Sequence, residues 1–263
     1  IGEYKVNKGK NDKAFNPVTE EEVQAEAERA YLEDDSQKPD IPQDLQERFN
    51  KIISIYDDYA RAAKLEEKDI EEDNEKMEKA FIFAYKAHRN QRRKTGEPYI
   101  IHPVSVALIL ADLKVDSATI QAALLHDTIE DTIVDDAMVT EKFGPVVCSL
   151  VDGVTKLGLL PLASREEQQA ENVRKMLLAM SQDIRVVVIK LADRLHNMRT
   201  IDFVREQKQR DKSLETMEVY APIAHRLGIR AVKEELEDLS LRHLDPVGYS
   251  QIEEKLVGQK EER

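Results

Sequence analysis

Residues 122–131 read AALLHDTIED, and this stretch indicates a helix with an apolar side and an ionisable side. Successive residues of an α-helix are rotated by about 100°, so residues three and four apart share a face. One face would carry the ionisable His126, Asp127, Glu130 and Asp131. The other would carry a narrow apolar stripe of Ala118, Ala122, Leu125 and Ile129. We therefore expect one helix over residues 116–131.

The ionisable face of this helix predicts a metal site. Carboxylates that crowd together on a largely apolar helix repel one another unless a cation or a shared proton relieves them. His126 and Asp127 can supply a nitrogen and an oxygen ligand to one ion, and Glu130 and Asp131 follow one turn later. A polar helix end whose acids face water is the alternative. The His-Asp dipeptide alone favours that alternative, but the Glu-Asp pair one turn later favours the metal.

Two other segments offer ligands of the same kinds. Residues 100–103, IIHP, place His102 at the start of a helix, and residues 191–200, LADRLHNMRT, place Asp193 inside another. The core stripe of the second helix would be Ile184, Val188, Leu191, Leu195 and Met198. The opposite face then carries Asp193, His196, Asn197 and Thr200. Such a face is typical of a site wall, and equally of an exposed surface on which Asp193 pairs with Lys190.

A basic cluster precedes the turn at Thr95-Gly96, about ten residues before His102. It consists of Arg89, Arg92, Arg93 and Lys94. Arginine side chains are suited to forked contacts with phosphate and to stacking on a base. Singly these residues would be solvated surface charges, so it is their proximity to His102 that indicates a binding role.

The composition indicates an all-α protein. The chain has 263 residues with no Trp and only 9 Gly, and strand-like alternation is not found between its turns. Helical spacing of apolar residues predicts helices over residues 45–63, 68–90, 103–113, 116–131, 135–142, 144–154, 165–181, 183–200, 207–226, 230–243 and 246–260. Residues 1–42 are poor in large apolar residues, so we expect an acidic, mobile extension with one helix over residues 18–30 behind Thr19.

The net charge and the cysteine content limit the classes of function and the compartment that fit this chain. The net charge of −13 argues against general nucleic-acid binding, because a phosphate backbone needs a basic face. Residues 1–80 hold 23 of the 52 acidic and 13 of the 39 basic residues, so the rest is nearly balanced and could hold a small anion. The single cysteine, Cys148, fits a reducing cytoplasm. The apolar runs are too short to span a membrane.

Four strings together resemble the hydrolase domain of the long RelA/SpoT homologues. They are RKTGEPYIIHP (93–103), HDTIED (126–131), VDGVTKL (151–157) and KLADRLHNMRT (190–200), and the resemblance covers about residues 75–263. It implies an all-α HD-domain fold of about ten helices. The implied activity is removal of the 3′-pyrophosphate from guanosine tetra- or pentaphosphate, ppGpp or pppGpp, the nucleotides of the stringent response.

The resemblance also implies roles for particular residues. A Mn²⁺ ion would be held by His102, His126, Asp127 and Asp193, although Zn²⁺ or Fe²⁺ could bind the same ligands. The catalytic acid and base would be Glu130 and Asp131, in an order that the sequence leaves open. The nucleotide would be contacted by Arg93, Lys94, Thr95, Tyr99, Asn197 and Thr200.

We expect residues 43–263 to form this hydrolase domain, with the synthetase domain absent. The chain would be either a domain excised from a longer protein or a stand-alone hydrolase, and the initial Ile1 favours excision. Its partner would be ppGpp or pppGpp, with no membrane and no direct nucleic-acid contact. Two alternatives stay open. Another HD phosphohydrolase, acting on dNTPs or cyclic nucleotides, would need the same ligands but does not explain residues 93–99. A non-catalytic module that senses the nucleotide would not need Glu130 and Asp131.

Overall fold

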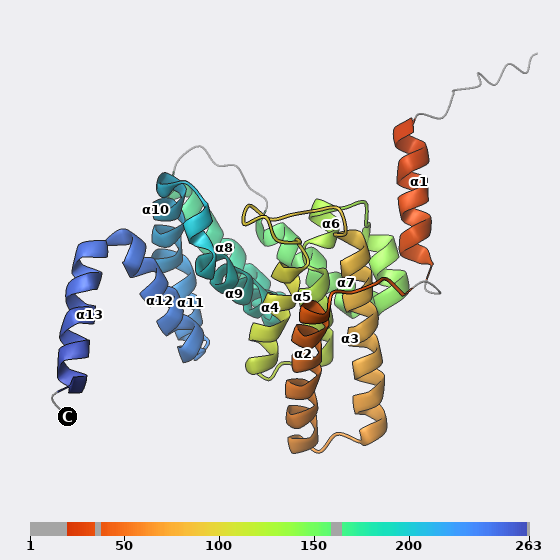
Figure 1. Ribbon diagram of the computed structural model, residues 1–263, viewed down its shortest axis with the longest axis horizontal. Helices are drawn as coiled ribbons and strands as arrows, with labels where there is room; N and C mark the ends of the chain where they lie inside the picture. The colour runs from red at the N-terminus through yellow and green to blue at the C-terminus, as the bar shows by residue number, and fades with distance from the viewer. Residues whose placement is uncertain (1–19, 35–37, 159–164, 262–263) are drawn as a thin grey trace, which may run out of the picture.

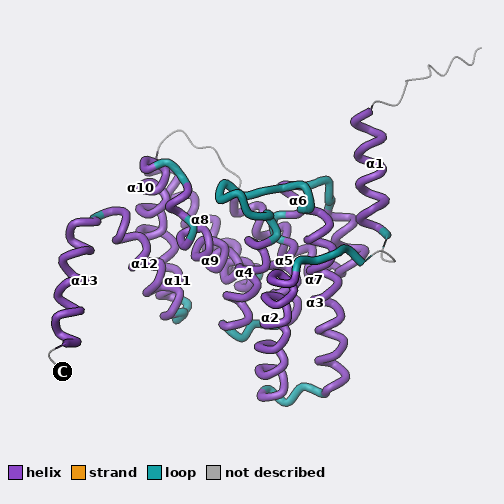
Figure 2. Tube along the Cα trace, in the orientation of Figure 1, coloured by secondary structure: helices purple, strands orange, loops and turns teal. Residues whose placement is uncertain are grey.

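The structure, a computed structural model, describes residues 20–34, 38–158 and 165–261. Within these ranges the chain forms helices α1 to α13 joined by short loops, and the described residues contain no strand (Figure 2). Arg92 and Pro98 form an isolated antiparallel bridge in the loop after α3. The all-α fold class is therefore confirmed, and most helices begin and end within a few residues of the expected ranges.

Helices α2 (Gln43–Ala62) and α3 (Glu67–Ala87) form an antiparallel hairpin at one side of the molecule (Figure 1). Each has apolar residues at helical spacing, and these turn toward the core. The buried rings of Phe49 and Phe81 stack with their centroids 4.4 Å apart. This contact fixes the two helices against each other and sets the position of the loop that follows α3.

Helices α4 (Ile101–Asp112), α5 (Ser117–Leu125) and α9 (Ile184–Arg199) occupy the centre of the fold (Figure 1). α4 packs on α2, α5 and α9, and α5 also packs on α3 and α7 (Asp136–Gly158). Every residue of α5 except Ala118 is buried. The expectation of an apolar stripe on one side is therefore wrong, because a helix covered on all sides needs a core-compatible surface all round. Ile184, expected in the core stripe of α9, is 49% exposed.

The single helix expected over residues 116–131 is also divided. α5 ends at Leu125, and α6 (Thr128–Asp131) begins after His126 and Asp127. The Thr128 hydroxyl donates to the Leu125 carbonyl at 2.7 Å, which satisfies a carbonyl that the end of α5 leaves open. Because of this break, His126 is buried while Asp131 lies at the surface. The ionisable residues therefore belong to a turn and a short helix, and not to one face of a long helix.

Helix α7 changes direction at Gly144, whose φ of 85° is in the left-handed region that favours glycine. Pro145 follows it. The bend agrees with the two helices that the sequence predicted over residues 135–142 and 144–154. Helix α8 (Arg165–Gln182) then packs on α9.

The other end of the molecule contains η1 (Ile201–Phe203), α10 (Glu206–Glu215), the π-helical turn η2 (Thr216–Tyr220), α11 (Ala221–Arg226), α12 (Arg230–Leu244) and α13 (Pro246–Glu261) (Figure 1). The sequence predicted one uninterrupted helix over residues 207–226. Pro222 has no N–H to donate to the preceding turn, and this explains why the hydrogen bonding changes register just before it.

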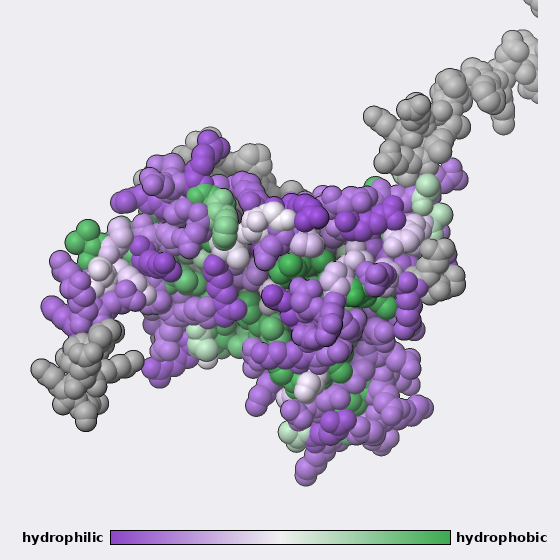
Figure 3. Space-filling view, viewed as in Figure 1, coloured by the Kyte–Doolittle hydropathy of each residue, from purple (hydrophilic) through white to green (hydrophobic). Residues whose placement is uncertain are grey.

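Helix α1 (Glu20–Glu33) projects from the body of the protein and docks through its last turn (Figure 1). Leu32 is buried, and the Lys86 amine lies 5.1 Å from the Tyr31 ring centroid and donates to the Asp34 carbonyl at 2.6 Å. The Thr19 cap lies outside the described residues. Polar residues dominate the face shown in Figure 3. Among the described helices we find none with the length and apolar character of a membrane span.

Candidate metal centre

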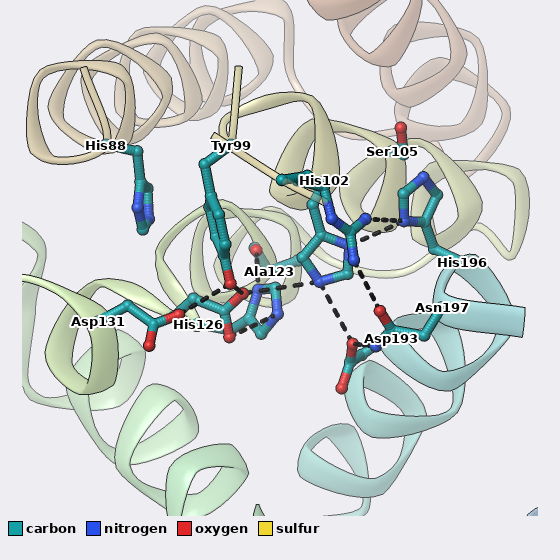
Figure 4. Close-up of polar contacts among 12 residues, drawn as sticks. His88, Tyr99, His102, Ser105, Ala123, His126, Asp131, Asp193, His196 and Asn197 are labelled. Carbon is teal, nitrogen blue, oxygen red and sulfur yellow. Dashed lines mark hydrogen bonds and ion pairs between the residues drawn. The ribbon is translucent and has the colours of Figure 1, made fainter. Parts of the chain in front are cut away.

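Three side chains, from α4 and from the turn after α5, converge in the middle of the fold (Figure 4). One ligand atom each from His102, His126 and Asp127 lies within 4.8 Å of the other two. Asp127 Oδ1 is 3.1 Å from His126 Nε2, and Asp127 Oδ2 is 3.6 Å from His102 Nε2. Both imidazoles are buried. The tertiary structure thus brings together three of the four ligands that the sequence predicted.

Asp193, the fourth predicted ligand, approaches the same point from α9. Its Oδ1 lies 3.3 Å from His102 Nε2 and accepts from the Asn197 amide, while Oδ2 accepts from the Lys190 amine at 2.9 Å. Burial disfavours the Asp193 carboxylate, but the Lys190 charge and the contacts with His102 and His126 together outweigh burial and hold the pKa of Asp193 well below its usual range. The sequence offered an ion pair between Asp193 and Lys190 as the alternative to a site. This ion pair forms, and it lies beside the proposed metal ligands His102, His126 and Asp127, which together with Asp193 we call the ligand group.

The donor atoms fit a divalent cation. His126 Nδ1 lies 2.8 Å from the Ala123 carbonyl, so this nitrogen carries the proton and Nε2 presents a lone pair. Nε2 is buried and makes no hydrogen bond to any described residue, although Asp127 Oδ1 is 3.1 Å away. Two acceptors that face each other in a buried site repel unless a cation or a shared proton lies between them. A backbone carbonyl on one imidazole nitrogen is also the usual outer partner of a metal-bound histidine.

The two remaining acidic residues lie at the edge of this group, on α6. Tyr99 Oη is 2.8 Å from Asp131 Oδ2 and 2.8 Å from Asp127 Oδ2, so one hydroxyl proton is shared by two carboxylates. Partial burial, followed by the charges of Asp131 and Asp127, raises the pKa of Glu130. Tyr99 was predicted to contact the nucleotide, and in the structure its hydroxyl is engaged by carboxylates.

Arg93 reaches from the loop after α3 across to α9. Its Nη2 donates to Asn197 Oδ1 at 2.8 Å, and its Nη1 lies 3.1 Å from His196 Nδ1. Arg93 and Asn197 were both predicted to contact the nucleotide. The fold places them together, next to Asp193, although 104 residues separate them in the sequence.

The other three residues that the sequence predicted to contact the nucleotide are Lys94, Thr95 and Thr200. In the structure their side chains are either exposed or hydrogen-bonded to nearby residues of the same segment. Lys94 is exposed on the loop. The Thr95 hydroxyl donates to Glu97 at 3.1 Å, and the Thr200 hydroxyl lies 3.2 Å from the His196 carbonyl at the end of α9. The roles of these three residues toward a nucleotide stay predictions.

Two histidines outside the predicted set take part in the network. His196 Nδ1 lies 2.8 Å from His102 Nδ1, and burial is the main reason that the pKa of His196 falls to about 3, which leaves the ring neutral. His88 stacks on the Tyr99 ring with centroids 4.7 Å apart, and its Nδ1 contacts Gln91. The position of His196, three residues after Asp193, was a usable signal in the sequence. Nothing in the linear pattern around His88 marks it.

Comparisons with known proteins identify the family of this chain. The family described as "HD domain" matches residues 80–230. A Myxococcus xanthus protein named GTP pyrophosphokinase is 52% identical over 190 residues, which are 71% of this chain and 25% of that protein. An Aquifex aeolicus protein named guanosine-3′,5′-bis(diphosphate) 3′-pyrophosphohydrolase is 48% identical over 79% of this chain and 27% of its own length. A Synechocystis protein named as a probable enzyme of the same activity is 52% identical over 70% and 24%.

A solved structure of a metazoan SpoT orthologue that hydrolyses ppGpp aligns with a TM-score of 0.50 at 27% identity, and the alignment covers 65% of this chain and 96% of that one. The chain spans about a quarter of the length of the curated relatives named above. The predicted kinship with the RelA/SpoT proteins is confirmed, and the chain belongs to the HD-domain family.

Proposed function

We propose that this chain hydrolyses ppGpp and pppGpp to GDP or GTP and pyrophosphate, with Mn²⁺ as its metal. The observation that carries the proposal is the buried His126 Nε2, which has no hydrogen-bond partner among the described residues and faces Asp127 beside the acidic pair. The names of two bacterial relatives and the activity of the metazoan orthologue support the substrate. The single cysteine supports a cytoplasmic location.

His102, His126, Asp127 and Asp193 would hold the ion through two nitrogens and two carboxylate oxygens. This mixed donor set suits Mn²⁺. When bound, the ion supplies Lewis-acid activation of water and of the scissile phosphoryl group. The Lys190 amine stays on the second oxygen of Asp193 and keeps that carboxylate ionised and oriented.

Glu130 and Asp131 move the protons. A water oxygen bonds to the phosphorus on the ribose 3′-oxygen, the bond from phosphorus to that oxygen breaks, and the 3′-oxygen gains a proton. The raised pKa of Glu130 suits it to hold the proton that the 3′-oxygen receives. Asp131, oriented by the Tyr99 hydroxyl, accepts the proton that the water loses. Each carboxylate thus has one task, and the pair returns to its starting state when the two exchange a proton with solvent.

Arg93 and Asn197 recognise the nucleotide at the edge of the ligand group. The guanidinium of Arg93 can stack on a guanine ring or fork onto its oxygen. Asn197 offers an amide that can hydrogen-bond the ribose or the base. Their mutual contact at 2.8 Å keeps both side chains in place before a nucleotide arrives. Lys94, Thr95 and Thr200 complete the proposed set.

Product analysis tests the proposal directly. The protein is incubated with ppGpp and Mn²⁺, with and without a chelator, and we expect GDP and pyrophosphate only in the sample without chelator. Parallel reactions contain dNTPs and cyclic nucleotides. Turnover of those substrates without release of pyrophosphate from ppGpp would assign the chain to another class of HD phosphohydrolase. Tight ppGpp binding with no turnover in Mn²⁺ would make it a sensing module.

The domain limits that we propose are residues 43–263 for the hydrolase and residues 1–42 for an N-terminal extension. Since the relatives are about four times as long as the matched region, we propose that the full-length protein also carries a synthetase domain. Limited proteolysis of the full-length protein would test these limits, and we expect a stable fragment that begins near residue 43.

A further inference from the structure

His196, on α9, contacts both the proposed metal ligand His102 and the proposed nucleotide contact Arg93 (Figure 4). Its Nδ1 is 2.8 Å from His102 Nδ1 and 3.1 Å from Arg93 Nη1. The ring is only 8% exposed, so water does not substitute freely for either contact. One atom of His196 therefore touches both a proposed metal ligand and a proposed nucleotide contact.

Both neighbours of His196 Nδ1 are hydrogen-bond donors when His102 is in the tautomer that can bind a metal. A guanidinium has donors only, so Arg93 can only donate. His102 Nε2 points toward Asp127 and Asp193, at 3.6 Å and 3.3 Å. To bind a metal, Nε2 must present a lone pair, so the proton of the neutral His102 ring must lie on Nδ1. The Nδ1 of a neutral imidazole has one lone pair. His196 can therefore accept one full hydrogen bond, and Arg93 and His102 compete for it.

We infer that His196 couples nucleotide binding to metal binding, and this inference rests on the proposed function, in which Arg93 turns to the guanine. When Arg93 leaves, the lone pair of His196 is available to His102 alone. The stronger hydrogen bond to His102 Nδ1 fixes the ring and makes Nε2 a better ligand. Because coupling between two binding events is reciprocal, bound metal favours the nucleotide by the same factor. His196 is thus a positioning residue that orders the assembly of the site.

The neighbouring contact through Asn197 does not produce the same competition. Arg93 donates to Asn197 Oδ1, whereas Asn197 donates to Asp193 through the separate atom Nδ2. Departure of Arg93 leaves that second bond unchanged. The coupling that we infer is therefore specific to His196, and a substitution there should remove it.

His196→Asn is the informative variant. The amide oxygen of asparagine lies near the position of Nδ1 and has two lone pairs, so it can accept from His102 and Arg93 together. His102 keeps its outer partner, and the competition ends. Arg92→Ala is the matched control for Arg93→Ala, because it removes the same charge from the neighbouring position, where the guanidinium donates to the Gly96 carbonyl at 2.9 Å.

The first measurement is Mn²⁺ affinity without nucleotide, by calorimetry. We expect Arg93→Ala to bind Mn²⁺ about 5-fold more tightly than Arg92→Ala, at the lower end of typical coupling factors. In a His196→Asn background the two arginine substitutions should have equal effects. Equal effects in the otherwise wild-type chain, or a difference that persists in the His196→Asn background, would overturn the inference.

The second measurement uses guanosine, which has no phosphate that could itself bind the metal. Guanosine should raise the Mn²⁺ affinity of the wild-type chain, and it should leave that of His196→Asn and of Arg93→Ala unchanged. An unchanged affinity in the wild type, or a rise in Arg93→Ala, would contradict the coupling. Neither measurement requires catalysis. If coupling is found but ppGpp is not hydrolysed, the proposed substrate is wrong and this inference stands. If ppGpp is hydrolysed but no coupling is found, this inference is wrong and the proposed substrate stands.

Discussion

Tyr99 Oη lies 2.8 Å from Asp131 Oδ2, and this hydroxyl joins the acidic edge of the site to the ligand group through its equal distance to Asp127. The phenol ring is held in place by the stacked His88 ring. A hydroxyl has one proton, so a cation on Asp127 would leave that proton to Asp131. The carboxylate of Asp131 is therefore oriented by a residue that the sequence assigned to the nucleotide.

Removal of this hydroxyl should slow the chemical step. We expect Tyr99→Phe to lower kcat by roughly 10–100-fold, because a hydrogen bond to a charged group contributes about 1.5–3 kcal/mol. KM for ppGpp should change little. Tyr85→Phe is the control, since that hydroxyl donates to the Asp40 carbonyl at 3.1 Å and does not contact the ligands or the acidic pair. A large rise in KM with unchanged kcat would instead show that Tyr99 binds the nucleotide, as the sequence predicted.

The acidic pair should be needed for turnover and not for metal. Glu130→Gln and Asp131→Asn keep the side-chain shape but remove the carboxylate, so each should lower kcat by about 10²–10⁴-fold. Bound Mn²⁺ and ppGpp affinity should survive. The pKa of Glu130 is raised, so its proton is lost only as the pH rises through that higher value. Activity that depends on this proton should fall on the alkaline side, and the pH–rate profile of Glu130→Gln should lack that limb.

Loss of a ligand should remove the metal itself. His126→Ala or Asp193→Ala should lower Mn²⁺ affinity by more than the roughly 10–100-fold that loss of an outer partner costs, and activity should fall with it. His225→Ala, at an exposed position on α11, is the matched control and should keep both. Metal content is measured on the purified proteins by atomic emission. Normal metal content and turnover in both ligand variants would refute the ligand assignment.

Arg93 should affect the nucleotide and not the retention of metal. Arg93→Ala should raise KM for ppGpp by roughly 10–100-fold, since it removes a charge-assisted contact. Mn²⁺ should remain bound at least as tightly as in the wild type. Steady-state kinetics and metal analysis of Arg93→Ala and Arg92→Ala distinguish the outcomes. Loss of metal with unchanged KM would show that the arginine supports the ligand group instead.

Lys212 should make stability depend on pH in the alkaline range. Burial, then the charges of Arg194 and Lys208, lower its pKa to about 8 from an ordinary value of 10.5. Below pH 8 the folded chain holds this amine charged at a cost. Between about pH 8 and 10 the unfolded chain binds more protons, so the free energy of unfolding rises with pH. Urea unfolding should show this rise in the wild type and in the exposed control Lys68→Met, and a smaller rise in Lys212→Met.

Much of the fold could be predicted from spacing alone. Helix α2 was expected over residues 45–63 and is found at Gln43–Ala62, because its apolar residues recur every three or four positions and face the core. Helix α9 was likewise expected over residues 183–200 and is found at Ile184–Arg199. The central helix α5 could not be predicted in this way. It is covered on nearly all sides, so periodicity could not show that it ends at Leu125.

The sequence by itself determined the all-α fold class, the family and the residue types that can hold a metal, since these depend on local periodicity and on motifs of a few residues. Only the tertiary structure decided the contacts between distant segments. It placed Tyr99 on Asp131, Lys190 on a buried Asp193, and His196 between Arg93 and His102. Hydrogen bonds between side chains depend on separations of about 3 Å, and packing of whole helices sets such separations, which no local pattern records.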